Sequence, residues 1–144
     1  MLIRILAAGI AGGIVFFALG YLMFGVLLDP YFRANMVEYP GLMKTPMPEM
    51  LPLIAWNLVN GIFFAFIFDR WASIRTFVGG LKGGAILMFM MMLMTDLQYV
   101  AFMNVWKGGP IPIMVDVLAG TVLGCLAGGA VGLVLGLMHK RAAE

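Results

Sequence analysis

Hydrophobic positions in this chain gather into four long runs, separated by shorter stretches that hold most of the proline and charged residues. Each run is near the roughly 20 residues that a helix needs to cross a hydrocarbon core of about 30 Å. The runs predict transmembrane helices over about 5–28, 51–68, 78–104 and 110–138, with an outer loop over 29–50. The predicted fold class is all-α: one domain, 1–144, that forms a polytopic, four-transmembrane-helix bundle.

Composition supports a membrane protein and argues against an ordinary soluble domain. The chain is 63% hydrophobic and only 11% charged, whereas soluble domains carry about a quarter charged residues. A net charge of +2 gives no reason to expect a nucleic-acid partner. The expected surroundings are therefore a lipid bilayer.

Basic residues are distributed unequally between the two sides of the predicted helices. The richer side carries Arg4, Arg70, Arg75, Lys82, Lys140 and Arg141, and the poorer side carries Arg33, Lys44 and Lys107. The richer side is normally cytoplasmic. We therefore expect both termini in the cytoplasm.

The two halves of the chain resemble each other, because RILAAGIAGGIVFF aligns with RTFVGGLKGGAILM and WNLVNG aligns with VDVLAG. The matched pairs include Arg4 with Arg75, Gly9 with Gly80, Gly13 with Gly84, Asn57 with Asp116 and Gly61 with Gly120. Both copies would start on the same side of the membrane. This pattern indicates a duplicated two-helix unit that forms two tandem parallel hairpins.

Glycines at helical spacing are predicted to be the helix-packing surfaces, since small residues let backbones approach closely in lipid. They are Gly9, Gly13, Gly80, Gly84, Gly120, Gly124, Gly128, Gly132 and Gly136. In the last run a four-residue step turns about 40° around the helix, so Gly120 and Gly136 differ by about 160°. The stripe therefore predicts two different neighbours, and with them a homo-oligomer or a larger membrane complex.

Polar side chains inside the apolar runs form the candidate site, because ionisable residues there are costly. Counted at 1.5 Å per residue, all of them but Tyr99, which shares a helix face with Asp96, lie about 8–12 Å from the outer helix ends. The candidates are Asp96, Asp116, Asn57, Asn60, Tyr21 and Tyr99. One interpretation is interhelical hydrogen bonding, at about 0.6–2 kcal/mol each. The other is a site for a proton, a cation or a small solute, because two adjacent carboxyls do not both ionise easily.

No catalytic constellation is visible, so an enzyme is not expected, and neither is a cofactor. The single histidine, His139, is expected to be solvated at the cytoplasmic edge. No metal site is predicted beyond one alternative, in which thioethers of Met43, Met47 and Met50 bind Cu(I), an ion that favours soft ligands.

The segments FFALGYLMFGVLL and MVDVLAGTVLGCLAGG resemble small bacterial four-helix membrane proteins catalogued as a domain of unknown function. The resemblance implies a bacterial inner-membrane setting. The predicted function is a structural or accessory subunit of a membrane assembly. The alternative is a small proton, cation or solute transporter or channel.

Overall fold

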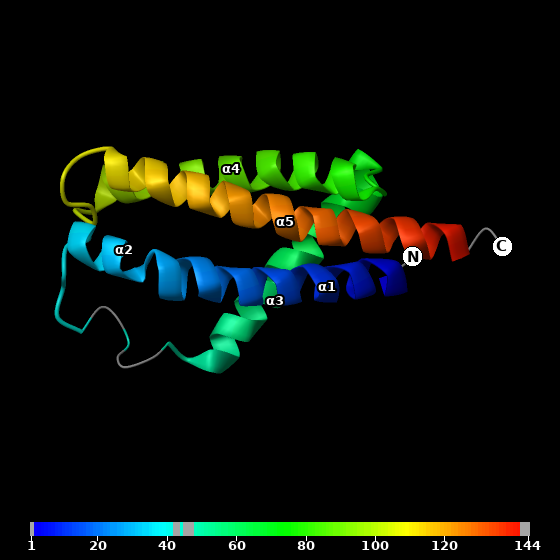
Figure 1. Ribbon diagram of the computed structural model, residues 1–144, viewed down its shortest axis with the longest axis horizontal. Coiled ribbons are helices and arrows are strands. Elements are labelled where there is room, and N and C mark those ends of the chain that lie inside the picture. Colours follow the sequence, from blue (N-terminus) through cyan, green and yellow to red (C-terminus); the bar gives the residue numbers. More distant parts are fainter. Residues whose placement is uncertain (1, 42–43, 45–47, 142–144) are drawn as a thin grey trace.

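The computed structural model describes residues 2–41, 44 and 48–141, and within these ranges the chain is helical with no β-strand. In chain order the elements are α1 (Leu2–Gly20), η1 (Tyr21–Leu27), α2 (Asp29–Asn35), α3 (Met50–Ile67), η2 (Phe68–Ala72), α4 (Phe77–Phe102) and α5 (Ile111–Arg141). Four helical segments are long and apolar enough to cross a membrane: α1 with η1, α3 with η2, α4 and α5. The predicted all-α, four-helix fold is confirmed, and each span begins and ends within a few residues of its expected position (Figure 1).

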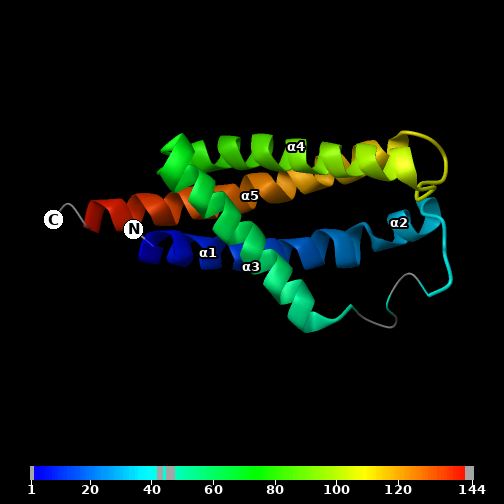
Figure 2. The same cartoon turned by 180° about the vertical axis from the view of Figure 1, so that it is seen from behind.

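Both chain termini lie at one end of the bundle, which we call the termini end (Figure 1). The connections that follow η1 and α4 lie at the opposite end, the loop end. α1 and α4 run in the same direction, in agreement with two parallel hairpins. α4 and α5 lie side by side along their length, whereas α3 crosses α1 obliquely and its Met50 end stands away from the bundle (Figure 2).

In the described part of the segment predicted as the loop 29–50, residues 29–35 form a short helix, α2. Pro30 lies in its first turn, where the missing N–H costs no hydrogen bond. Arg33 donates to the Asp29 carboxylate at 2.7 Å across one turn. Of the three methionines in the copper alternative, Met43 and Met47 fall outside the described residues, and Met50 is the exposed first residue of α3.

Two π-helical segments follow α1 and α3 in place of regular α-helical turns. Such wider turns rotate the following side chains relative to a regular helix. η2 ends at Ala72 and is followed by Ser73, which adopts a left-handed conformation (φ 50°) and reverses the chain. Thr76 then caps α4 by accepting a hydrogen bond from the Gly79 N–H at 3.0 Å, a common start for a helix.

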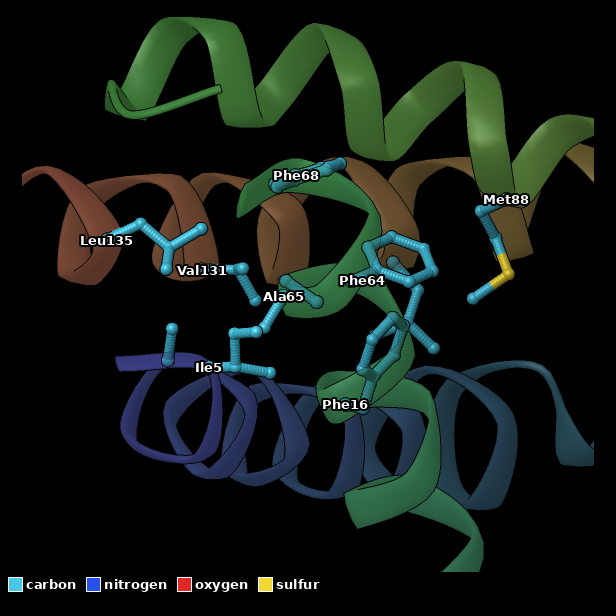
Figure 3. Close-up of a cluster of buried hydrophobic side chains, with 11 residues drawn as sticks. Ile5, Phe16, Phe64, Ala65, Phe68, Met88, Val131 and Leu135 are labelled. Carbon is cyan, nitrogen blue, oxygen red and sulfur yellow. The ribbon is translucent and has the colours of Figure 1, made fainter. Parts of the chain in front are cut away.

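The apolar core lies between α1, α3 and α5, with one methionine from α4 (Figure 3). Phe16 and Phe64 meet edge to face with ring centroids 5.1 Å apart, and Phe68 follows at 5.9 Å from Phe64. Val131 and Leu135 of α5 are fully buried beside them. These side chains hold the first hairpin against the second.

The first hairpin packs through backbone contact between α1 and α3. A methyl group built on Gly61 would overlap the carbonyl oxygen of Gly9 and the amide nitrogen of Gly13. No side chain larger than hydrogen fits there without separating the helices.

The second hairpin packs in the same way. A methyl group on Gly84 would overlap the Gly124 carbonyl oxygen and lie 2.9 Å from the Gly128 Cα, and one on Gly80 would overlap the Gly128 carbonyl oxygen. The predicted packing role of these glycines is therefore visible as direct backbone contact.

The expectation that Gly120 and Gly136 need two different partners is wrong. Gly120 faces the side chain of Met92 on α4, while Gly136 faces the carbonyl of Arg75 immediately before α4. α4 carries its own row of residues at four-residue spacing. Each row rotates around its helix by the same angle per step, so the two rows continue to face each other. The long side chain of Met92 extends the α4–α5 contact to Gly120, and the backbone of Arg75 extends it to Gly136.

The two hairpins do not pack in the register that the internal alignment suggests. Gly61 makes the closest approach in the first hairpin, but its aligned counterpart Gly120 contacts a methionine. Gly124 and Gly128, one and two turns farther along, make the backbone contacts of the second hairpin. The hairpins are alike in direction and in the use of glycine, and they differ in geometry.

Candidate functional site

The structure brings Asp96 of α4 and Asp116 of α5 together near the loop end. Asp96 is only 1% exposed, and Asp116 is partly buried. The two carboxyl groups lie within interaction range of each other. We refer to them as the carboxyl pair.

Helical spacing explains why the two acids meet. The α4 face that contacts α5 follows a four-residue row that ends at Asp96: Gly80, Gly84, Met88, Met92 and Asp96. The opposing α5 row begins at Asp116 and continues through the glycine stripe. Because Met92 sits against Gly120, the next step on each helix places Asp96 opposite Asp116.

Trp106, from the connection between α4 and α5, covers the carboxyl pair. Its indole N–H is buried and lies within interaction range of Asp96. Its ring centroid is 5.9 Å from that of Phe32 in α2, and Phe32 in turn stacks on Phe24 at 5.8 Å. The sequence predicted no role for Trp106 in the candidate site, since nothing in its neighbourhood points to a buried acid.

Hydrogen bonds join the two connections at the loop end, and we call this set the loop tie. Met36 and Trp106 form an antiparallel bridge. Around it, Val37 N–H donates to Val105 O at 2.8 Å, Lys107 N–H to Asn35 O at 2.7 Å, and Tyr39 Oη to Asn104 O at 2.8 Å. Residues 108 and 109 are glycines with φ of 82° and 85°, which lets the chain turn into α5 at little steric cost.

Polar atoms of this site are buried without partners. Within the described ranges, both carboxylate oxygens of Asp96 and the Nε1 of Trp106 have no hydrogen-bond partner. Buried polar atoms are nearly always paired, and leaving one unpaired costs about 1–3 kcal/mol. No group of three or more His, Cys, Asp or Glu side chains that could hold a metal ion occurs among the residues described.

The predicted asparagines lie elsewhere. Asn57 and Asn60 are buried on α3, where each Nδ2 donates to a carbonyl of its own helix, Leu53 O at 2.8 Å and Trp56 O at 2.9 Å. Because α3 crosses α1 obliquely, this face of α3 packs on the α1 glycines, near Gly13. The two amides are satisfied locally and are not part of the carboxyl pair's surroundings.

The predicted tyrosines also stay outside a buried site, since Tyr21 is 59% exposed and Tyr99 is 39% exposed. Tyr21 lies in η1, where the π-helical winding changes its direction from that of a regular helix. Of the six predicted site residues, the structure places only Asp96 and Asp116 against each other.

A second polar cluster, which sequence reasoning missed, lies at the termini end. Arg4 of α1 is 3.8 Å from the buried Asp69 carboxylate in η2, and its guanidinium is 3.4 Å from Nε2 of His139 on α5. His139 is thus partly buried, with a buried Nδ1, and its expected full solvation is wrong. The sequence signal was the lone acid Asp69 at the end of an apolar run, beside Arg70.

Comparison of the chain with protein-family models, with curated proteins and with solved structures gave no match. The resemblance to small bacterial four-helix membrane proteins stays a prediction.

Proposed function

We propose that this protein is a structural or accessory subunit of a membrane assembly, and that it associates with a second copy of itself through α4. The observation that carries the proposal is that α4 buries one face against α5 and exposes most of the rest of its surface. An exposed transmembrane helix has room for a further neighbour.

The exposed surface of α4 near the loop end carries polar side chains. A shallow hollow of about 400 Å³ there is lined by Thr95, Gln98, Tyr99, Phe102 and Met103. Amide and hydroxyl side chains in membrane-spanning helices form hydrogen bonds across helix–helix interfaces.

A second copy is the occupant that this surface favours. A glutamine amide both donates and accepts hydrogen bonds, so it can pair with its own counterpart. Across a two-fold axis the same patch meets itself, and an axis that passes beside Gln98 pairs this amide with its counterpart. Aromatic and methionine side chains around the amide supply the close packing that association in lipid requires.

Cysteine cross-linking in native membranes tests this proposal. Cys125 is first replaced by alanine, and then Gln98→Cys is compared with Val122→Cys, an exposed position on α5. We expect a covalent dimer from Gln98→Cys and none from Val122→Cys. Gln98→Leu should weaken the dimer in single-molecule counting. A protein that stays monomeric and gives no cross-link at position 98 would contradict the proposal.

We also propose that the termini end faces the cytoplasm of a bacterial cell. The basic residues Arg4, Arg70 and Arg75 lie at that end of the helices, whereas the loop end carries Arg33 and Lys107. Short segments rich in Lys and Arg are retained on the cytoplasmic side. Reporter fusions to each terminus and to the connection 103–110 test this orientation, and a terminus reporter active outside the cytoplasm would exclude it.

A further inference from the structure

The carboxyl pair presents a problem of charge that the helix packing alone does not solve. Asp96 and Asp116 sit together in the loop-end half of the α4–α5 pair, and Asp96 has no contact with solvent. Two ionised carboxylates at this position would repel each other strongly in surroundings of low polarity. Something must neutralise at least one of them.

Charged and titratable groups on the surrounding elements do not supply this neutralisation. On the connection, the side chain of Lys107 is exposed. On α2, Arg33 already pairs with Asp29 at the surface. The groups that interact with Asp96 are the other acid and the indole of Trp106, and neither is a cation.

We propose that Asp96 and Asp116 form a proton-binding site, closed by the indole N–H of Trp106. A shared proton makes one carboxyl an O–H donor to the other, and the negative charge of the pair falls from two to one. Carboxyl pairs at close range share a proton in this way.

The bound proton also accounts for the unpaired atoms. With one proton in place, the carboxyl O–H donates to an oxygen of the second carboxylate, and the Trp106 Nε1–H donates to an oxygen of Asp96. The Asp116 carboxyl and the Trp106 indole already lie within interaction range of Asp96. A Ca²⁺ ion takes about 6–8 oxygen ligands, more than the four that two carboxyls supply, and an indole N–H cannot be a ligand.

The loop tie holds Trp106 over the buried Asp96 side of this site. Trp106 takes part in the backbone bridge to Met36 and its ring packs on Phe32. Proton exchange with water on the Asp96 side therefore requires Trp106 and its connection to move, whereas Asp116 is partly exposed. The indole emission of Trp106 should report the protonation of the pair directly.

Infrared spectroscopy of the full chain in lipid nanodiscs, labelled with carboxyl-¹³C aspartate, tests the proposal without any substitution. We expect a labelled band of protonated carboxylic acid at neutral pH. Asp96→Asn should remove or shift this band, and Asp29→Asn, the exposed control on α2, should leave it unchanged. A native chain in which all labelled aspartates are ionised at neutral pH would overturn the proposal.

Trp106 fluorescence provides the second measurement. Trp56 and Trp71 are both exposed, so phenylalanine at these two positions leaves Trp106 as the only reporter. We expect its emission to change in one pH transition that is lost in Asp96→Asn. If Na⁺, K⁺, Mg²⁺ or Ca²⁺ at constant pH moves the emission and removes the acid band, a metal cation occupies the site and the proposal is wrong.

Discussion

Replacing Gly84 with alanine tests whether backbone contact between α4 and α5 holds the second hairpin together. The added methyl would overlap the Gly124 carbonyl oxygen and lie 2.9 Å from the Gly128 Cα. Ordinary contact begins at 3.4 Å, so clearing the Gly128 Cα alone requires α5 to move away by 3.4 − 2.9 = 0.5 Å, and clearing the nearer Gly124 carbonyl oxygen requires a larger movement. The obstacle is backbone, which cannot rotate aside as a flexible side chain can.

A gap of this size forfeits about a quarter to a half of the van der Waals attraction of each contact it opens. Overpacking of this kind costs about 1–3 kcal/mol in protein cores. Alanine returns about 0.5–1 kcal/mol through its better helix propensity. We therefore expect Gly84→Ala to lower the free energy of unfolding by about 1–2 kcal/mol.

Gly20→Ala is the matched control, because the nearest atom to its new methyl is Leu123 Cδ2 at an ordinary 3.6 Å. This change should be neutral or stabilise by up to about 1 kcal/mol. Unfolding in mixed micelles of mild detergent and dodecyl sulfate, followed by tryptophan fluorescence, measures both. Equal effects of the two substitutions would refute the view that close α4–α5 contact stabilises the bundle.

Three further predictions concern other parts of the fold. Gly61→Ala should lower the free energy of unfolding by about 1–2 kcal/mol for the same reason as Gly84→Ala. In the double variant the two effects should add. Strong non-additivity would show that the hairpins do not pack independently. Arg4→Met leaves the Asp69 carboxylate buried without its cation and should lower the free energy of unfolding by about 1–2 kcal/mol. The loss is smaller than for a fully buried pair because Arg4 is partly exposed. Adding Asp69→Asn should restore most of this free energy in the same unfolding assay. Tyr39→Phe removes one exposed hydrogen bond of the loop tie, which contributes about 0.5 kcal/mol. It should speed amide hydrogen exchange at the loop end and leave exchange in α5 unchanged. Faster exchange throughout the protein would show that the Tyr39 hydrogen bond does not act locally.

Hydrophobic run length predicts the four spans of this chain because the bilayer thickness dictates helix length. The carboxyl pair follows from spacing as well, since Asp96 and Asp116 each lie one step beyond a row of packing residues. Span length is a property of a single helix, and the meeting of the two acids is a property of one antiparallel pair. Both can therefore be predicted from residue spacing.

The angle of α3 against α1 depends on how Gly61 fits between Gly9 and Gly13, which no single-helix pattern reveals. Treating all helices as parallel therefore placed Asn57 and Asn60 in the layer of the carboxyl pair, while the oblique crossing turns them toward α1. Trp106 was missed in its covering role for a related reason, because its position depends on hydrogen bonds to a connection about seventy residues earlier.

The loop tie also constrains how the protein matures during synthesis. Chains emerge from the ribosome with the N-terminal part first, so residues 35–39 reach the loop end before residues 104–107 have been made. The hydrogen bonds that join Asn35, Val37 and Tyr39 to residues 104–107 can therefore form only after the third span has crossed the bilayer. Until then the backbone N–H of Val37 and the carbonyl of Asn35 lack these partners.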